Sequence, residues 1–261
     1  MEISLKNKKA LVGGSTQGLG KSIAWQLAEC GATVTLMARN EEKLKSVLNE
    51  LPAQPGQMHS YLVADFSELN SFKEIISAFL KVHPVDILVN NTNGPEAGGV
   101  MGKGISDYQN AFNLIFQTVC CTTLEALPYM IKNNFGRILN VSSISVKEPL
   151  QHLVLSNTIR SSLISWTKTL ATEVARNNIT VNNILTGYFD TERINSLMSI
   201  QAKSKNIEFK EIKKNTVEQI PMKRLGRPEE YGYLVSFLAS DFASYITGAN
   251  IPIDGGLLKS I

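Results

Sequence analysis

Two side chains in the segment SNTIR have the types and the spacing to act on one ligand. Ser156 and Arg160 begin a stretch, SNTIRSSLISWTKTLATEVA, whose apolar spacing predicts a helix, so the two lie one turn apart on one face. The Arg160 guanidinium stays protonated and presents a planar fork of donors, which suits the hydroxyl groups of a ligand. The Ser156 hydroxyl is a far weaker acid than a phenol. The pair therefore indicates binding more than acid catalysis.

A glycine-rich segment, VGGSTQGLGKSIA, lies between a predicted strand and a predicted helix. Glycines without side chains let backbone N–H groups approach a pyrophosphate, and the helix N-terminus adds positive potential. A tight strand-to-helix turn with no ligand is the alternative, but the strand before and the helix after favour a dinucleotide. The predicted contacts are Gly14, Ser15, Thr16, Gln17, Gly18, Leu19 and Gly20.

The end of the second predicted strand, MARNEEKL, indicates which dinucleotide is bound. A carboxylate at this place would accept hydrogen bonds from the 2′-hydroxyl of NAD, whereas this chain has Arg39 and Asn40. A guanidinium favours the 2′-phosphate of NADP, so we predict NADP over NAD. The alternative is that Arg39 pairs on the surface with Glu41 or Glu42.

Strand and helix patterns alternate along most of the chain. Strands are predicted over 9–14, 32–38, 59–64, 86–90, 137–142, 180–185 and 250–253, and helices over 19–30, 41–51, 69–82, 107–133 and 156–176. This order predicts one α/β domain over residues 1–261, with a Rossmann-like, doubly wound, parallel seven-stranded sheet and helices on both faces. Residues 187–228 form an insertion of the kind that often makes a lid. Its lysine-rich part is either a solvated helix face or a contact for an acidic ligand.

Composition narrows the class of protein. Hydrophobic residues make up 43% and charged residues 19% of the chain, and the net charge of +3 is too small to indicate nucleic acid. Cys30, Cys120 and Cys121 have neither metal-ligand spacing nor a disulfide framework, so we predict no metal and a reducing cytoplasm. The N-terminus has no targeting pattern, and no run approaches the roughly 20 apolar residues of a membrane span. No membrane partner is expected.

Five motifs in order carry a family resemblance: GGSTQGLG, the Asp65 of VADFSE, the asparagine pair of ILVNN, the NVSS of 140–143 and the terminal ITGANIPIDGG. Together they resemble the short-chain dehydrogenase/reductase family over nearly the whole chain, and in particular reductases of the 3-oxoacyl-carrier-protein type. The resemblance implies cofactor contacts from Asp65, Phe66, Asn91, Thr92, Gly187 and Thr191. Alternatively, Asp65 caps the next helix and Asn90 serves loop backbone groups. Thr186 stands where the family usually has proline.

The same resemblance implies four catalytic positions. In the family a tyrosine gives a proton to a carbonyl that receives hydride, assisted by a serine, a lysine and an asparagine. Asn113 matches the asparagine and Ser143 the serine, whereas Ser156 stands at the tyrosine position and Arg160 at the lysine position. Arg160 is therefore expected to hold cofactor ribose hydroxyls. Water, His152 or Tyr188 would have to replace the missing phenol as proton source. The alternatives are that His152 is an exposed loop residue without a role and that Tyr188 packs against the cofactor or the insertion.

Two functions remain open from the sequence. The first is an NADP-dependent oxidoreductase that transfers hydride to a carbonyl, a 3-oxoacyl thioester or another ketone. The second is a dinucleotide-binding sensor or scaffold protein without catalytic activity. The expected partners are a small carbonyl or alcohol and further copies of the chain in a homodimer or homotetramer. The helices 107–133 and 156–176 carry apolar residues on more than one face, which either pack in the core or meet another copy.

Overall fold

The computed structural model describes residues 2–260 and contains one seven-stranded sheet in the order β3-β2-β1-β4-β5-β6-β7, with every pair parallel. The strands are β1 (Lys9–Gly13), β2 (Thr33–Ala38), β3 (Ser60–Val63), β4 (Ile87–Asn90), β5 (Gly136–Val141), β6 (Ile179–Thr186) and β7 (Asn250–Ile253). The predicted Rossmann-like sheet is therefore confirmed. The strand order reverses between β1 and β4, and ligands of such sheets bind at the carboxyl ends of the strands there.

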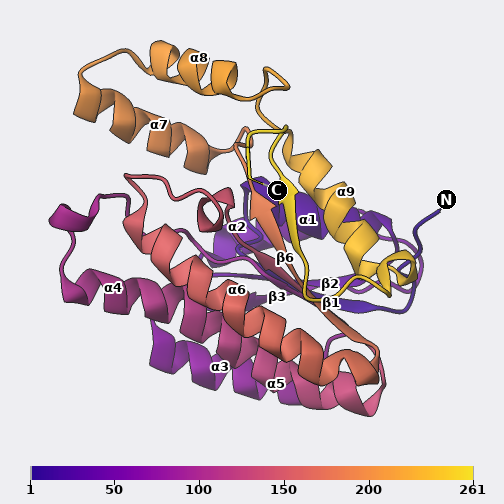
Figure 1. The fold of residues 1–261 in the computed structure, drawn as a ribbon. Coiled ribbons are helices and arrows are strands. Elements are labelled where there is room, and N and C mark those ends of the chain that lie inside the picture. The colour runs from indigo at the N-terminus through magenta and orange to yellow at the C-terminus, as the bar shows by residue number, and fades with distance from the viewer. Residues whose placement is uncertain (1, 261) are drawn as a thin grey trace.

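Helices cover both faces of the sheet (Figure 1). The helices α1 (Gly18–Glu29), α2 (Glu41–Glu50) and α9 (Pro228–Ala239) pack on one face, and α3 (Leu69–Val82), α5 (Thr118–Lys132) and α6 (Val154–Val174) cover the other. Strands of this kind are apolar on both sides because neither face meets water. Leu11 and Val12 of β1 are fully buried and belong to opposite core clusters, as that rule requires.

The predicted helix 107–133 is interrupted. It consists of α4 (Ile105–Ala111), a π-helical segment (Phe112–Gln117) and α5, with Pro128 inside the last. Contrary to the prediction that no run is long and apolar enough for a membrane span, residues 105–132 meet that criterion by length and mean hydropathy. Leu127 and Met130 of α5 pack in the core between α3 and the sheet, whereas Leu124 and Ile131 are exposed, so core packing accounts for only part of this apolar helix.

The insertion between β6 and α9 holds two helices, α7 (Glu192–Lys205) and α8 (Phe209–Gln219), which project beyond the sheet (Figure 1). They pack on each other through an apolar cluster of their own, which includes Met198, Ala202 and Ile212. This small core is separate from the two sheet cores. The insertion is thus an ordered helical pair rather than an irregular loop.

A row of four asparagines, three of them buried and Asn250 exposed, joins the four neighbouring strands β4, β5, β6 and β7. Asn90 Nδ2 donates to Asn140 Oδ1 at 2.9 Å, Asn140 Nδ2 to Asn183 Oδ1 at 3.1 Å, and Asn183 Nδ2 to Asn250 Oδ1 at 2.8 Å. Thr123 and Thr167 accept the second hydrogens of Asn90 and Asn140. A buried network whose members find partners fixes one arrangement of the strands.

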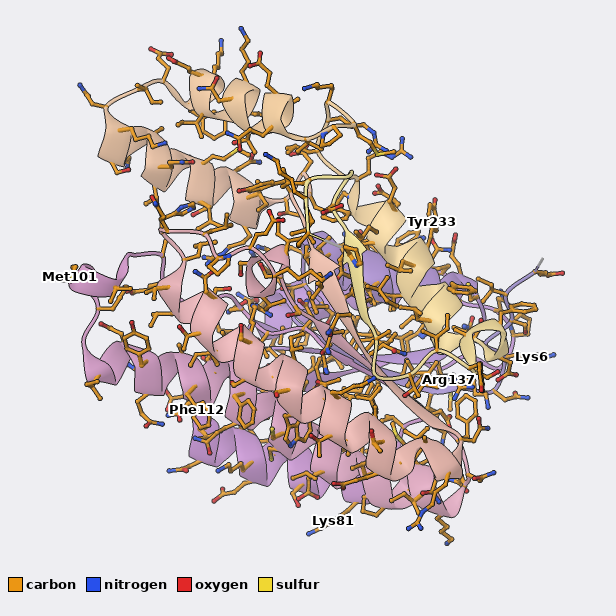
Figure 2. The ribbon with its side chains drawn as sticks, viewed as in Figure 1. Lys6, Lys81, Met101, Phe112, Arg137 and Tyr233 are labelled. Atoms are coloured by element: carbon orange, nitrogen blue, oxygen red, sulfur yellow. The ribbon has the colours of Figure 1, made fainter. Side chains whose placement is uncertain are left out.

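The opposite end of the sheet is fastened by a buried cation (Figure 2). Arg137, at the beginning of β5, is fully buried and donates to the carbonyls of Gly136 and Asn178 at 2.9 and 3.0 Å. Its guanidinium also pairs with Asp241 at 3.3 Å, because a buried charge needs such partners. This contact lies away from the carboxyl ends of the strands.

Candidate active site

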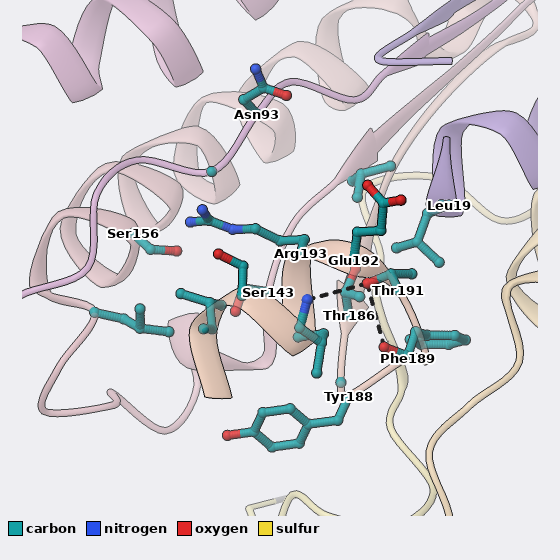
Figure 3. Close-up of a pocket in the computed structure, with 18 of the residues that line it drawn as sticks. Leu19, Asn93, Ser143, Ser156, Thr186, Tyr188, Phe189, Thr191, Glu192 and Arg193 are labelled. Carbon is teal, nitrogen blue, oxygen red and sulfur yellow. Dashed lines mark hydrogen bonds between the residues drawn. The ribbon is translucent and has the colours of Figure 1, made fainter. Parts of the chain in front are cut away.

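One cavity of about 580 Å³ opens at the carboxyl edge of the sheet (Figure 3). Its wall is assembled from the β1–α1 loop, the chain after β4, the end of β5, the first turns of α6, and the segment from β6 into α7. It therefore lies where the strand order reverses, as the fold predicts for a ligand site.

The glycine loop has the clearance that a phosphate cradle needs. Gly14 and Gly18 have φ values of 57° and 54°, in the left-handed region that favours glycine. A Cβ at Gly20 would lie 2.1 Å from the carbonyl oxygen of Gly14, so no side chain fits there. Asn91 Nδ2 donates to the Gly13 carbonyl at 3.0 Å and holds the loop against β4. These residues fit a dinucleotide.

Five of the seven residues predicted over this loop line the cavity: Gly14, Gln17, Gly18, Leu19 and Gly20. The other two do not. The Ser15 side chain is fully buried, and its hydroxyl accepts from the backbone N–H of Met37 in β2 at 2.9 Å. Thr16 lies outside the wall. Ser15 thus secures the loop to the sheet and is not open to a ligand through its hydroxyl.

The residues predicted to read the adenosine end have other contacts in the structure. The Arg39 guanidinium lies 3.9 Å from Asp65 and remains 65% exposed, so its ion pair is with Asp65 and not with Glu41 or Glu42. The exposed guanidinium is free to meet a phosphate. Asn40 caps α2 by accepting from Lys43 N at 2.9 Å.

Asp65 and Phe66 follow β3. Partial burial raises the Asp65 pKa, but hydrogen bonds from Ser67 and the charge of Arg39 outweigh it and leave the pKa below its usual value. The Phe66 ring is buried in the core beside Phe72, with the ring centres 5.4 Å apart. Neither residue belongs to the cavity wall, so the predicted contacts of Arg39, Asn40, Asp65 and Phe66 lie outside it.

The other predicted cofactor residues, Asn91, Thr92, Gly187 and Thr191, all line the cavity. Thr191 caps α7, accepting from Ile194 N and donating to the Phe189 carbonyl, both at 3.4 Å. A Cβ at Gly187 would lie 2.6 Å from the Asp254 Cα, so that glycine is required by packing between chain segments. Ser142 beside them is buried, lines the same wall and has an unpartnered hydroxyl, which a cofactor hydroxyl or amide fits.

Ser143, Ser156 and Arg160 come together on the facing wall. Ser143 follows β5, and its Oγ accepts from Ser145 N at 3.1 Å, which leaves its hydrogen for a ligand. Ser156 lies in the first turn of α6, and its hydroxyl has no hydrogen-bond partner among residues 2–260. Arg160 lies one turn later and donates to the Val141 carbonyl at 2.6 Å. The predicted pairing of Ser156 and Arg160 on one face is present.

The Arg160 guanidinium is a buried cation, and no carboxylate among residues 2–260 forms an ion pair with it. Burial lowers its pKa to about 10, opposed by Tyr231 and aided by the nearby charge of Arg193. It stays protonated at neutral pH and gives the cavity a fixed positive charge. The Tyr231 hydroxyl, also buried, pairs at 3.0 Å with Thr186, the residue at the family's usual proline position.

Asn113 is not brought to this wall. It lies in the π-helical segment, and its Oδ1 accepts from Gln109 at 2.8 Å and Gln117 at 2.6 Å. Its helix position matches the resemblance, but its carboxamide oxygen is already occupied by its neighbours along the helix. Sequence spacing alone could not reveal this local competition.

The two alternative proton sources both border the cavity. His152 is exposed, and partial desolvation together with the charge of Lys205 lowers its pKa, so the imidazole is neutral at pH 7. Tyr188 packs on the apolar cluster of α7 and α8, and burial raises its pKa. Tyr188 therefore has the packing role that the sequence left open.

Several residues of the wall were not predicted from the sequence, and Ser142, Asn93, Gly94 and Arg193 are among them. Arg193, in the first turn of α7, donates to the Pro95 carbonyl at 2.8 Å, and Figure 3 shows its guanidinium directed toward Ser143 and Ser156. The sequence does contain an arginine two residues after the predicted cofactor residue Thr191, which could have suggested a role in the site. Only the fold shows that the side chain turns inward.

Comparisons with known proteins agree with this architecture. Residues 14–258 match the family described as enoyl-(acyl carrier protein) reductase. The 3-oxoacyl-[acyl-carrier-protein] reductase FabG of Aquifex aeolicus is 34% identical over 98% of this chain and 100% of its own length.

Solved structures give the same result. The NADPH-dependent reductase YwfH, involved in bacilysin biosynthesis, has a TM-score of 0.91 and 31% identity over 97% of this chain and 99% of its own. The L-sorbose reductase of Gluconobacter frateurii, solved with NADPH and L-sorbose, has a TM-score of 0.91 and 27% identity over both full chains. On the glycine loop, the sheet order and these matches, the chain belongs to the short-chain dehydrogenase/reductase family of NAD(P)-dependent oxidoreductases.

Proposed function

We propose that this protein is an NADPH-dependent reductase of a ketone or 3-oxoacyl thioester whose active site uses Ser156 and Arg160 where relatives use tyrosine and lysine. The observation that carries the proposal is that the glycine loop, Ser143, Ser156 and Arg160 face one cavity. NADPH-bound relatives such as the L-sorbose reductase support the choice of coenzyme. When bound, NADPH would supply hydride, so that a ketone, NADPH and one proton give an alcohol and NADP⁺.

The chain's own groups divide the remaining work. The Ser143 hydroxyl has its hydrogen free and would donate to the carbonyl oxygen, where negative charge develops. Arg160 would hold ribose hydroxyls and add positive charge without releasing a proton. Ser156 is too weak an acid to protonate the product at neutral pH. His152 is neutral at pH 7, so solvent water is the proposed proton source.

Without a phenol at position 156, the rate of ketone reduction is expected to be low. A positioned general acid usually contributes about 10² to 10⁴ in rate, so its loss slows hydride transfer without abolishing it. The rest of the acceleration comes from orientation and from stabilisation of the oxyanion, which need Ser143 and the bound coenzyme. Slow turnover is therefore compatible with this site.

Titration and turnover together test the proposal. Calorimetry with NADPH and NADH should give tighter binding of NADPH. NADPH consumption should then be followed with a panel of ketones, 3-oxoacyl thioesters and quinones. His152→Ala should leave turnover unchanged if water delivers the proton. Absence of heat with either coenzyme would refute the dinucleotide site itself.

The second candidate is a dinucleotide-binding sensor or scaffold protein without turnover. It is motivated by the absence of both the phenol and the lysine ammonium and by the bond that ties Arg160 to the Val141 carbonyl. Binding of NADPH with no consumption on any member of the panel would favour this function. Consumption with even one substrate, abolished by Ser143→Ala, would favour the reductase.

We also propose that the protein is a cytoplasmic homodimer or homotetramer. Its three cysteines are free thiols, in keeping with a reducing compartment. Leu163 belongs to the core, whereas Phe112, Phe116 and Trp166 are only partly buried and Leu124 of α5 is 57% exposed. These side chains offer an apolar surface to a second copy. Sedimentation as a monomer would contradict this part of the proposal.

A further inference from the structure

The end of the cavity next to Ser143 carries an excess of positive charge. Arg160 of α6 and Arg193 of α7 both line it, and no carboxylate oxygen lies within 4.0 Å of either guanidinium among residues 2–260. Glu192 also borders the cavity, but Figure 3 shows its carboxylate directed toward Leu19, away from Arg193. Paired arginines are the rule inside proteins, so two unpaired ones facing one space require an external anion or exposure to solvent.

Most of the donors of Arg193 are unoccupied. A guanidinium has five N–H donors, and the structure gives Arg193 one hydrogen bond, to the Pro95 carbonyl. That bond anchors one nitrogen and fixes the direction of the fork. The residue is exposed to the open cavity, so the other donors are accessible to a ligand. An anchored planar fork of this kind matches the two oxygens of a carboxylate or a phosphate.

The neighbouring backbone leaves room for this arginine. A Cβ at Gly94 would lie 2.9 Å from the Arg193 Nη2 and 3.4 Å from its Cζ. The φ angle of Gly94 is not positive, so backbone conformation does not require a glycine at this position. A side chain at this position would therefore displace the guanidinium from its present place. Two segments far apart in the sequence, the chain after β4 and the first turn of α7, thus fit each other at this point.

The two arginines can be assigned to different ligands. Arg160 lies deeper, is bound to the end of β5, and has the proposed contact with the coenzyme. Arg193 enters from the insertion and points toward Ser143 and Ser156, where the carbonyl group would be held. We propose that Arg193 binds an oxyanion of the substrate, so that the substrate is a small carbonyl compound that also carries a carboxylate or a phosphate. This inference rests on the reductase function proposed above.

The mouth of the cavity is consistent with an anionic ligand. The charge of Lys205, in the last turn of α7, helps to lower the pKa of the wall residue His152, so Lys205 adds positive potential near that part of the wall without lining it. Desolvation lowers the pKa of Arg193, which a bound anion would reverse. The main competing role for Arg193 is a contact with the coenzyme, and the experiment has to separate the two.

Matched substrates test the inference by turnover. Pyruvate and acetoacetate would be compared with their methyl esters, and dihydroxyacetone phosphate with dihydroxyacetone. We expect kcat/KM to be at least about 10-fold higher for one charged class than for its neutral partner. Arg193→Met should raise KM for the charged substrate about 10- to 100-fold with little change in kcat, and Arg193→Lys should restore part of the loss. Which class responds distinguishes carboxylate from phosphate.

A binding measurement covers the case in which no substrate is turned over. With the protein saturated in NADP⁺, calorimetry would compare butyrate with butyramide, and inorganic phosphate would serve as the second probe. Butyrate or phosphate should bind, and Arg193→Met should weaken that binding at least about 10-fold while the NADPH dissociation constant stays unchanged. Lys203→Met is the matched control, since it removes one exposed charge from α7 outside the cavity.

The outcomes separate the two proposals. Anion binding that depends on Arg193, without NADPH consumption, would contradict the reductase and retain the oxyanion site. Equal use of acids, phosphates and neutral partners would overturn the oxyanion site and retain the reductase. Parallel loss of NADPH affinity and anion binding in Arg193→Met, or no binding of either anion, would also overturn it.

Discussion

Ser156 stands where the family resemblance implies a tyrosine, and the proposed function depends on this position more than on any other. Its hydroxyl is short and has no hydrogen-bond partner among residues 2–260, and Arg160 and Arg193 line the same cavity. A phenol in the same place would be polarised by the adjacent cations and could pass a proton to a ligand. In the proposed reductase, serine at this position therefore supplies no acid catalyst, while the two arginines keep positive charge at the carbonyl site.

Restoring the family's pair should increase turnover. In the double variant Ser156→Tyr with Arg160→Lys, the new phenol regains a donor role, and the rate of ketone reduction should rise at least about 10-fold. NADPH-coupled turnover measures this. The single variant Arg160→Lys is the control, because it changes the cation without supplying an acid. No gain in the double variant would mean that Arg193 or the insertion has closed the space needed by the ring.

Arg39 should set the choice of coenzyme. Its guanidinium is 65% exposed and bound only loosely to Asp65, at 3.9 Å, so it can turn to a 2′-phosphate. Arg39→Ala should weaken NADPH binding about 10-fold, or about 1.4 kcal/mol, and leave NADH binding unchanged. Fluorescence titration with both coenzymes checks this. Equal losses for the two would show that Arg39 acts through the loop rather than through the phosphate.

At the scale of elements, the beginning of α9 is held by a charge cluster. Glu230 accepts from Arg224 at 2.7 and 2.8 Å and from the backbone N–H of Arg227 at 2.8 Å. These hydrogen bonds, those from Arg224 foremost, lower the Glu230 pKa to about 2. Helix α9 packs on α1 beneath the glycine loop, so this cluster supports the cofactor side of the cavity from outside.

The pKa of Glu230 predicts how stability depends on pH. A carboxylate whose folded pKa lies below its unfolded value of about 4.3 stabilises the fold at higher pH and loses that effect as pH falls toward 2. Glu230→Gln should lower the free energy of unfolding by about 1 kcal/mol at pH 7, since the group is partly exposed. Urea unfolding between pH 7 and 3 should show the gap between variant and wild type closing below about pH 4. A gap independent of pH would contradict the charge cluster.

At the scale of the molecule, the asparagine row joins the strands that carry both halves of the site. Asn91 follows β4 and Ser143 follows β5, so the spacing of these strand ends sets the distance between the cofactor loop and the substrate hydroxyl. Asn140, in the middle of the row, bonds to partners on both sides and to Thr167. Its loss would leave several buried polar groups unpaired.

Asn140→Leu should therefore be strongly destabilising. Removing the carboxamide leaves Asn90, Asn183 and Thr167 without a hydrogen-bond partner at that position. The free energy of unfolding should therefore fall by about 3 kcal/mol. Chemical denaturation measures the loss. Asn215→Leu, at an exposed position on α8, is the control and should change stability by less than about 0.5 kcal/mol. Similar losses in the two variants would argue against the network.

Sequence periodicity predicted the sheet and most helix positions, because burial on both faces and turn chemistry are local properties. The helix 69–82 has the predicted bounds, whereas the stretch 107–133 contains a π-helical turn that no hydrophobic pattern reveals. Within the site, the glycines were predictable from backbone clearance. The inward turn of Arg193 and the use of the Ser15 hydroxyl by β2 were not, because each depends on a segment distant in the sequence.

The amide bonds of the asparagine row all run in one direction, from β4 toward β7. Reversing the amide of Asn140 or Asn183 would set two donors face to face on one side and two acceptors on the other. These two inner side chains therefore cannot turn over alone, and their neighbours hold them in place. The strand ends that carry Asn91 and Ser143 should then keep their geometry while α7 and α8 adjust to the ligand that Arg193 binds.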